Sequence, residues 1–101
     1  MSPWDPLAGG TPAGGPFYTY VHRNPVADEV FYVGKGKGER AWNILNRNKV
    51  HRRIIDDLHK QGFHMGELAE IIRGGLSEPE AKELEASLIR VFHKDNLAND
   101  K

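Results

Sequence analysis

The sequence predicts an α+β fold, in which a small three-stranded antiparallel sheet, an N-terminal β-hairpin plus one later strand, is flanked by about three helices. Two observations carry most of this prediction. Two short runs of aromatic and β-branched residues stand on either side of a turn, which is typical of a hairpin. Ser77 and Glu80 form an S-x-x-E capping box before an amphipathic segment, which is typical of a helix N-terminus.

The hairpin is expected to follow a leader. Residues 1–15 are rich in Gly, Pro and Ala and show no periodicity, so we expect a flexible leader there and one folded domain over residues 16–101. The predicted strands are Pro16–His22 and Val30–Gly34, and an Asn-Pro pair between them supplies turn chemistry.

The later elements follow from helix periodicity and from breaking residues. We expect a glycine-rich loop at Gly34–Gly38, helices at Glu39–Asn46 and Lys49–Lys60, a third strand at His64–Arg73, and a last helix from Ser77 to Phe92. The second of these helices should end at Gly62. A chain of 101 residues can bury one modest core in this way, which implies a single functional site.

Composition excludes several classes of protein. The chain has no cysteine, which rules out disulfides and a thiolate zinc site as stabilising elements. It has no apolar run of the roughly 20 residues needed to cross a bilayer and no signal-peptide pattern, so a cytoplasmic location is expected.

Charge is unevenly distributed along a chain whose formal net charge is zero. Between residues 35 and 53 the only acidic residue is Glu39, whereas the basic residues are Lys35, Lys37, Arg40, Arg47, Lys49, Arg52 and Arg53. Such a run is either a solvated surface or a contact for a polyanion. Its position beside a glycine-rich loop favours a contact for a polyanion.

Two polar residues occupy positions where apolar ones are expected. Glu85 falls within the apolar arc of the last helix, so its carboxylate must be ion-paired, solvated in a cleft or bound to a metal. His51 falls within the apolar arc of the preceding helix, where a hydrogen-bonded core residue is commoner than a catalytic one. The other histidines show no metal-ligand spacing and receive no role: His22, His59, His64 and His93.

Three blocks of the sequence together resemble the GIY-YIG nuclease superfamily. They are YTY at 18–20, FYVGKGKGERAW at 31–42 and EAKELEASLI at 80–89, and the resemblance extends over about residues 17–99. Thr19 and Tyr18 replace the usual Ile and Gly of the first block. The FYVGKGKGxR form is especially similar to stand-alone phage and bacterial members and to a branch fused to ankyrin repeats.

The resemblance implies a metal-dependent endonuclease that hydrolyses phosphodiester bonds in DNA, with an active site of Tyr20, Tyr32, Arg40 and Glu85. Glu85 would hold a single Mg²⁺ or Mn²⁺, Arg40 would bind the scissile phosphate, and one of the two tyrosines would orient and deprotonate the attacking water. The remaining basic residues would grip the flanking DNA backbone, together with Asn99: Lys35, Lys37, Arg47, Lys49, Arg52 and Arg53.

One position departs from the family pattern. Many relatives carry a histidine four residues after the arginine, where this chain has Ile44. His51 stands where some members place a second histidine, which implies a phosphate-contacting or proton-transfer role for it. The alternatives to a nuclease are a catalytically silent nucleic-acid-binding module of the same fold and a protein-interaction domain. The substrate could be branched or structured DNA, and specificity could require a dimer or a recognition partner.

Overall fold

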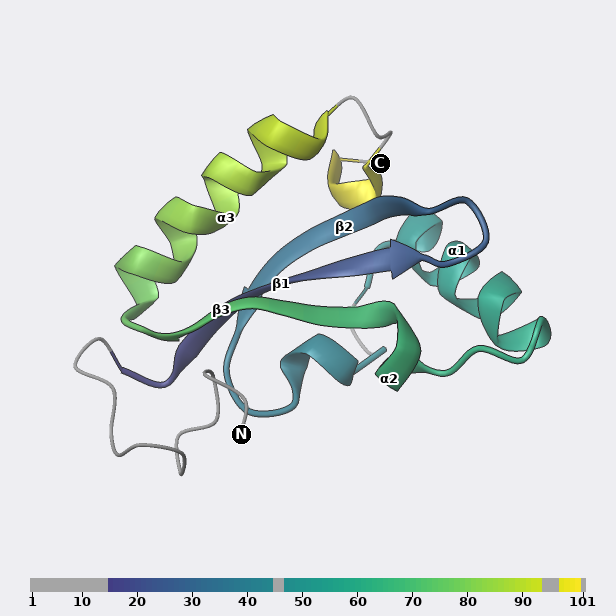
Figure 1. The fold of residues 1–101 in the computed structure, drawn as a ribbon, viewed down its shortest axis with the longest axis horizontal. Coiled ribbons are helices and arrows are strands. Elements are labelled where there is room, and N and C mark those ends of the chain that lie inside the picture. The colour runs from purple at the N-terminus through teal and green to yellow at the C-terminus, as the bar shows by residue number, and fades with distance from the viewer. Residues whose placement is uncertain (1–14, 45–46, 94–96, 101) are drawn as a thin grey trace.

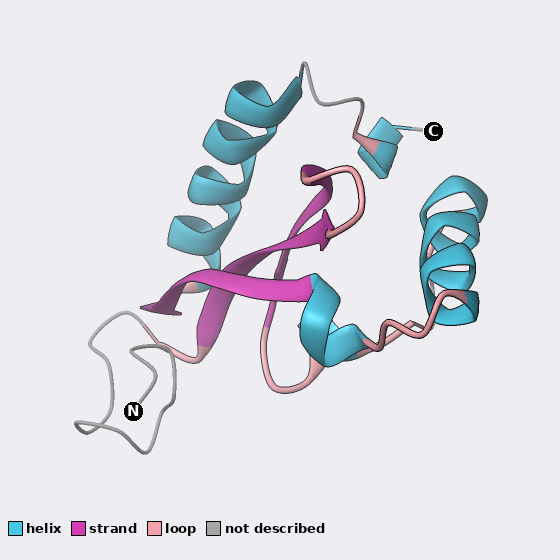
Figure 2. Cartoon of the chain, turned by 45° about the vertical axis from the view of Figure 1, so that its right-hand side comes forward, coloured by secondary structure: helices cyan, strands magenta, loops and turns pink. Residues whose placement is uncertain are grey.

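The computed structural model describes residues 15–44, 47–93 and 97–100. A three-stranded antiparallel sheet in the order β2-β1-β3 lies at the centre, as the sequence predicts (Figure 1). Helix α3 (Glu78–Phe92) covers one face of the sheet, and α1 (Lys49–Lys60) packs on the other side (Figure 2). The predicted leader lies almost wholly outside the described residues. No helix in the described part of the chain is long and apolar enough to cross a membrane.

The predicted hairpin is confirmed, with strands that extend beyond the predicted ends. Strand β1 (Phe17–Asn24) pairs with β2 (Glu29–Gly36), and the Asn24 side-chain oxygen accepts hydrogen bonds from two turn amides. The register shifts after His22, so that Phe31 is an extra residue in β2. Such a bulge turns two successive side chains to one face, and Phe31 and Tyr32 both pack on the α1 side of the sheet.

Two predicted elements are wrong in extent. Over residues 39–44, the described part of the predicted helix Glu39–Asn46, the structure has a 3₁₀ turn, η1 (Arg40–Trp42), followed by an extended Asn43. The Tyr18 hydroxyl donates to the Gly38 carbonyl at 2.7 Å and accepts from the Ala41 N–H at 2.9 Å, so a contact from a distant strand fixes this tight turn.

The third strand also begins later than predicted. A short helix, α2 (Met65–Leu68), occupies the first half of the predicted range, and β3 runs over Ala69–Leu76. The Glu67 carboxylate accepts a hydrogen bond from the His64 N–H at 3.2 Å, a local cap that favours the helical turn.

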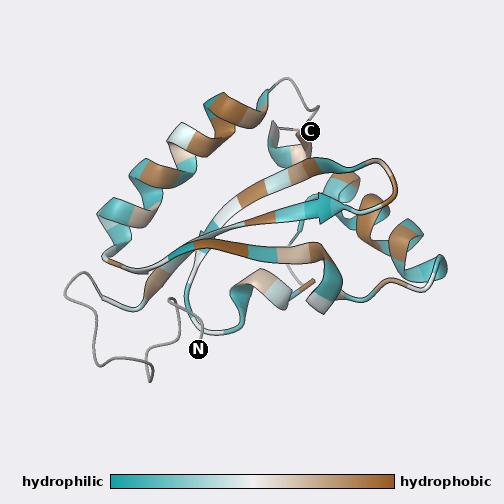
Figure 3. Cartoon of the chain, in the orientation of Figure 1, coloured by the Kyte–Doolittle hydropathy of each residue, from teal (hydrophilic) through white to brown (hydrophobic). Residues whose placement is uncertain are grey.

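The two long helices are confirmed. Asn48 caps α1 by accepting from the His51 N–H at 2.8 Å, and Gly62, with φ of 100°, follows the end of the helix. The Ser77–Glu80 capping box starts α3 as predicted. Apolar residues recur along α3 (Figure 3), and Leu88, Ile89 and Phe92 pack on the core residues Val21 and Val33.

The C-terminal turn η3 (Ala98–Asp100) protects the outer edge of β2. Asn99 accepts from the Val33 N–H at 3.0 Å and donates to the Val33 carbonyl at 2.6 Å, as a neighbouring strand would. The amide oxygen and one amide N–H of Asn99 are thereby occupied. The structure therefore gives Asn99 a role in the fold, although the sequence suggested a nucleic-acid contact.

Replacing Asn99 by Asp should destabilise the domain by about 1–3 kcal/mol, because a carboxylate would face the Val33 carbonyl without a donor. The free energy of unfolding in urea measures this change. Asn24→Asp is the matched control, since the Asn24 oxygen acts only as an acceptor and an aspartate retains that function. Equal stability of the two variants would contradict this assignment.

Candidate active site

The candidate site is built on two glycines of β2. Tyr20 of β1 is paired with Gly34, and a Cβ atom added to Gly34 would lie 2.6 Å from the Tyr20 Cζ and hydroxyl oxygen. A Cβ atom on Gly36 would lie 2.6 Å from the Arg40 Cβ. Only residues without side chains allow the Tyr20 ring and the Arg40 stem to lie directly on the strand. These glycines thus allow close packing of other parts of the same chain against β2.

Tyr20 and Tyr32 lie on the same face of the sheet with their ring centroids 6.3 Å apart. Arg47 joins them: its Nη1 donates to the Tyr20 hydroxyl oxygen at 2.7 Å, and its guanidinium lies 5.6 Å and 5.3 Å from the centroids of the Tyr20 and Tyr32 rings. The sequence grouped Arg47 with the flanking basic residues. No local pattern distinguished it from them, because its partners come from β1 and from the η1 turn.

Burial and the nearby positive charge shift the pKa of Tyr20 in opposite directions. Burial raises the pKa of its phenol above the ordinary value, and the adjacent Arg47 opposes that rise through its charge and its hydrogen bond. The raised pKa leaves Tyr20 a neutral phenol near pH 7. Its oxygen accepts from Arg47, and its own proton has no acceptor among the described residues.

His51 is fully buried, as its position on α1 predicted, and its partner is His22. The two rings share a hydrogen bond between His22 Nδ1 and His51 Nε2 at 2.8 Å, and His22 Nε2 lies 2.6 Å from the Ala41 carbonyl oxygen. A carbonyl only accepts, so His22 carries its proton on Nε2 and His51 donates to His22 Nδ1. His51 Nδ1 is then a buried acceptor without a partner among the described residues.

This pair stays neutral and supports Tyr32. Burial is the main cause that lowers the pKa of His22 to about 4 and that of His51 to about 2, and the His51 ring stacks on Tyr32 with centroids 3.9 Å apart. These features favour the hydrogen-bonded core residue over a proton-transferring base. Sequence reasoning missed His22, whose only signal is that it alternates with Tyr18 and Tyr20 along β1.

Glu85 approaches the same stretch of β2 from the α3 side. Its half-buried carboxylate accepts a hydrogen bond from the backbone N–H of Lys35, the residue between Gly34 and Gly36. Burial raises the pKa of this carboxyl, while the charges of Lys35 and Lys82 and the Lys35 N–H oppose that rise. The Lys35 ammonium itself contacts Glu78 at 3.4 Å.

The donor set around Glu85 fits only one kind of metal site. The described residues contain no group of three or more His, Asp and Glu side chains placed to hold a metal. A single carboxylate is compatible with Mg²⁺, which keeps several waters and takes further ligands from substrate phosphates, but it is not enough for a protein cage.

The other predicted DNA contacts are dispersed around this centre. Lys35 and Lys37 lie over the Phe17 ring at 5.7 Å and 5.5 Å, and Lys49, Arg52 and Arg53 are exposed on α1. Arg52 is paired with Asp56 at 3.0 Å. Ile44 packs against the apolar cluster around Phe31.

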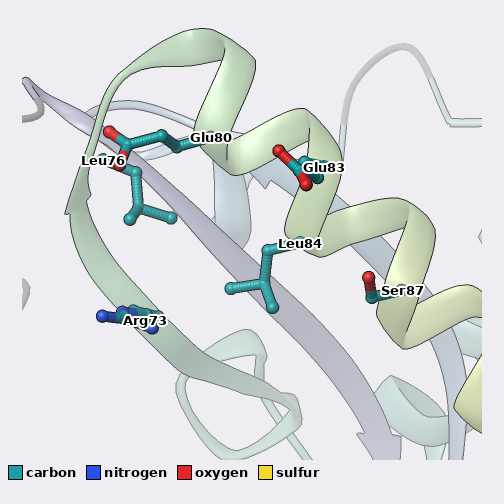
Figure 4. Close-up of a pocket in the computed structure, with 6 residues that line it drawn as sticks. All are labelled: Arg73, Leu76, Glu80, Glu83, Leu84 and Ser87. Carbon is teal, nitrogen blue, oxygen red and sulfur yellow. The ribbon is translucent and has the colours of Figure 1, made fainter.

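A separate hollow of about 310 Å³ lies between β3 and α3 (Figure 4). Arg73 and two glutamates, Glu80 and Glu83, line it together with Leu76, Leu84 and Ser87. Its carboxylates outnumber its one cation, which makes it a poor contact for a polyanion.

Comparisons of the chain with protein-family models, with curated proteins and with solved structures each gave no match.

The histidine pair predicts a specific loss of stability in mild acid. Both pKa values are below the ordinary 6.5, so the unfolded chain binds protons that the folded chain excludes, and stability falls as the pH drops below about 6.5 towards 4. Urea denaturation should show a loss of roughly 2–4 kcal/mol between pH 7.5 and pH 5.

His59→Gln, which removes an exposed histidine, should keep the full pH dependence. The double variant His22→Phe/His51→Phe should be less sensitive to pH over this range. A wild-type stability that is flat between pH 7.5 and pH 5 would show that the pair is not held neutral.

Proposed function

We propose that this protein is a metal-dependent endonuclease that hydrolyses phosphodiester bonds in DNA, with its active site at the outer edge of β2. One observation carries the proposal. Tyr20 and Arg40 lie over Gly34 and Gly36 on one side of the strand, and Glu85 binds the N–H of the intervening Lys35 from the other side. A phosphate at this edge would have a carboxylate, a phenol and guanidinium groups within one short segment.

Phosphodiester hydrolysis needs an oriented water, neutralised phosphoryl oxygens and a stabilised leaving group. Arg40 supplies a planar, permanently charged group for the phosphoryl oxygens. Tyr20, as a neutral phenol, suits hydrogen-bond donation to a phosphoryl oxygen or to water, which leaves Tyr32 as the better candidate for orienting the nucleophile. The His22–His51 pair would fix the Tyr32 ring by stacking.

Glu85 would hold a divalent ion, which when bound neutralises phosphoryl charge and makes a water ligand more acidic. The hydrogen bond from the Lys35 N–H holds the half-buried carboxylate of Glu85 at the strand edge. Lys35, Lys37, Lys49, Arg52 and Arg53 would bind the flanking backbone without sequence preference, a contribution that weakens as salt rises.

The test is cleavage of supercoiled plasmid and of a branched oligonucleotide in Mg²⁺ or Mn²⁺, with and without EDTA. Wild-type protein should cut only with the metal. Glu85→Gln, which keeps the shape and removes the charge, should lose roughly 100-fold or more in rate. Glu83→Gln, an exposed neighbour on the same helix, is the matched control and should cut like wild type.

Three outcomes would overturn the proposed activity or its proposed site. A folded wild-type protein that binds DNA but cuts neither substrate would be a catalytically silent nucleic-acid-binding module. A folded protein that neither cuts nor binds DNA would point to a protein-interaction domain. Metal-dependent cutting that survives Glu85→Gln would place the metal elsewhere.

A further inference from the structure

The geometry points to Arg47 as a pre-formed phosphate-binding fork, locked beside Tyr20 so that its guanidinium and the Tyr20 hydroxyl hold the same phosphodiester. This inference rests on the proposed nuclease function and adds a phosphate-contacting residue to it. The sequence predicted that Arg47 contacts flanking DNA at the surface. Here Arg47 is instead a fixed component of the site formed by Tyr20 and Tyr32.

Three hydrogen bonds fix the guanidinium of Arg47. Nη1 donates to the Tyr20 hydroxyl at 2.7 Å, Nη2 to the Arg40 carbonyl at 2.7 Å, and Nε to the Asn43 carbonyl at 2.9 Å. Two of these acceptors are backbone atoms, so the plane of the group cannot turn without moving the η1 turn. An arginine has five N–H donors, and among the described residues one N–H on each Nη is left for a ligand.

The charge of Arg47 has neutral partners only. Its acceptors are a phenol and two carbonyls, and none of the ion pairs between described residues includes it. The group is half-buried against the rings of Tyr20 and Tyr32. A partly desolvated cation normally has an anionic partner, which indicates that an anion from outside the chain completes this site.

Tyr20 indicates what kind of anion this is. Its oxygen accepts from Arg47, its proton has no acceptor among the described residues although the residue is 1% exposed, and Arg47 presents two further donors nearby. A phosphodiester has two non-bridging oxygens and can accept from both groups at once. Arg47 would then place the phosphate against Tyr20, while the exposed lysines and arginines supply most of the affinity for DNA.

The opposing account is that Arg47 only clamps the η1 turn to β1. The test uses protein with ¹³Cζ-labelled tyrosine, whose three tyrosines give three signals, and a phosphorothioate oligonucleotide added without metal. Binding should shift the Tyr20 signal in wild type. Arg47→Lys, which keeps the stem and charge but not the fork, should lose that shift, as should Arg47→Met. Arg90→Met, an exposed arginine on α3, should retain it.

The kinetic readout separates positioning from binding. Arg47→Lys should lower kcat for DNA cleavage about 100-fold and change KM by less than about threefold, because the lost interaction acts on the reacting phosphate. If Arg47 only clamped the turn, Arg47→Lys would lower the melting temperature. It would leave kcat and the Tyr20 shift in folded protein unchanged. If Arg47→Met does not fold, Arg47→Lys carries the test.

The inference is overturned if Arg47→Lys matches wild type in kcat and in the oligonucleotide-induced Tyr20 shift. Its failure is distinguishable from failure of the proposed function. If wild type cuts no DNA, a Tyr20 shift that requires Arg47 still supports the phosphate fork, and a Tyr20 signal that does not respond to the oligonucleotide overturns it.

Discussion

The contact between the Tyr20 ring and Gly34 is the constraint on which the rest of the site depends. With no Cβ at Gly34, the ring crosses β2 and brings its hydroxyl to Arg47. Arg47 in turn holds the carbonyls of Arg40 and Asn43, so one close approach between two strands fixes the turn that follows them. A methyl group at residue 34 would force the Tyr20 ring away from β2. The links between Tyr20, Arg47 and the turn would then be lost.

The sheet places different chemistry on its two faces. On the α3 side, Val21, Val30 and Val33 form an apolar core, and the Thr19 hydroxyl donates to the Ala81 carbonyl at 3.0 Å. On the α1 side the buried aliphatic residues Ile55, Leu58 and Leu68 are joined by aromatic and polar groups, which include a chain from the Ala41 carbonyl through His22 to His51. The hydrogen bonds between its members offset much of the cost of burying this network, although His51 Nδ1 has no partner among the described residues, and the network orders the rings around Tyr32.

Local signals in the sequence were sufficient for the hairpin, the capped helix α3 and the inward positions of Glu85 and His51. They were insufficient where a distant partner decides the structure. The η1 turn replaces a helix because Tyr18, some twenty residues earlier, binds both sides of it. The His22–His51 bond and the Arg47–Tyr20 bond join residues 29 and 27 positions apart, and neither spacing has a pattern that a single sequence reveals.

The proposed function depends on a divalent ion that Glu85 would hold at the edge of β2, and Mn²⁺ would report the position of such an ion directly. Mn²⁺ added to ¹⁵N-labelled protein with a phosphorothioate oligonucleotide broadens the amide signals nearest the metal. The account predicts selective broadening of Lys35 and Glu85, and its loss in Glu85→Gln. Broadening centred on the exposed Glu80 and Glu83, with Lys35 unaffected, would contradict it.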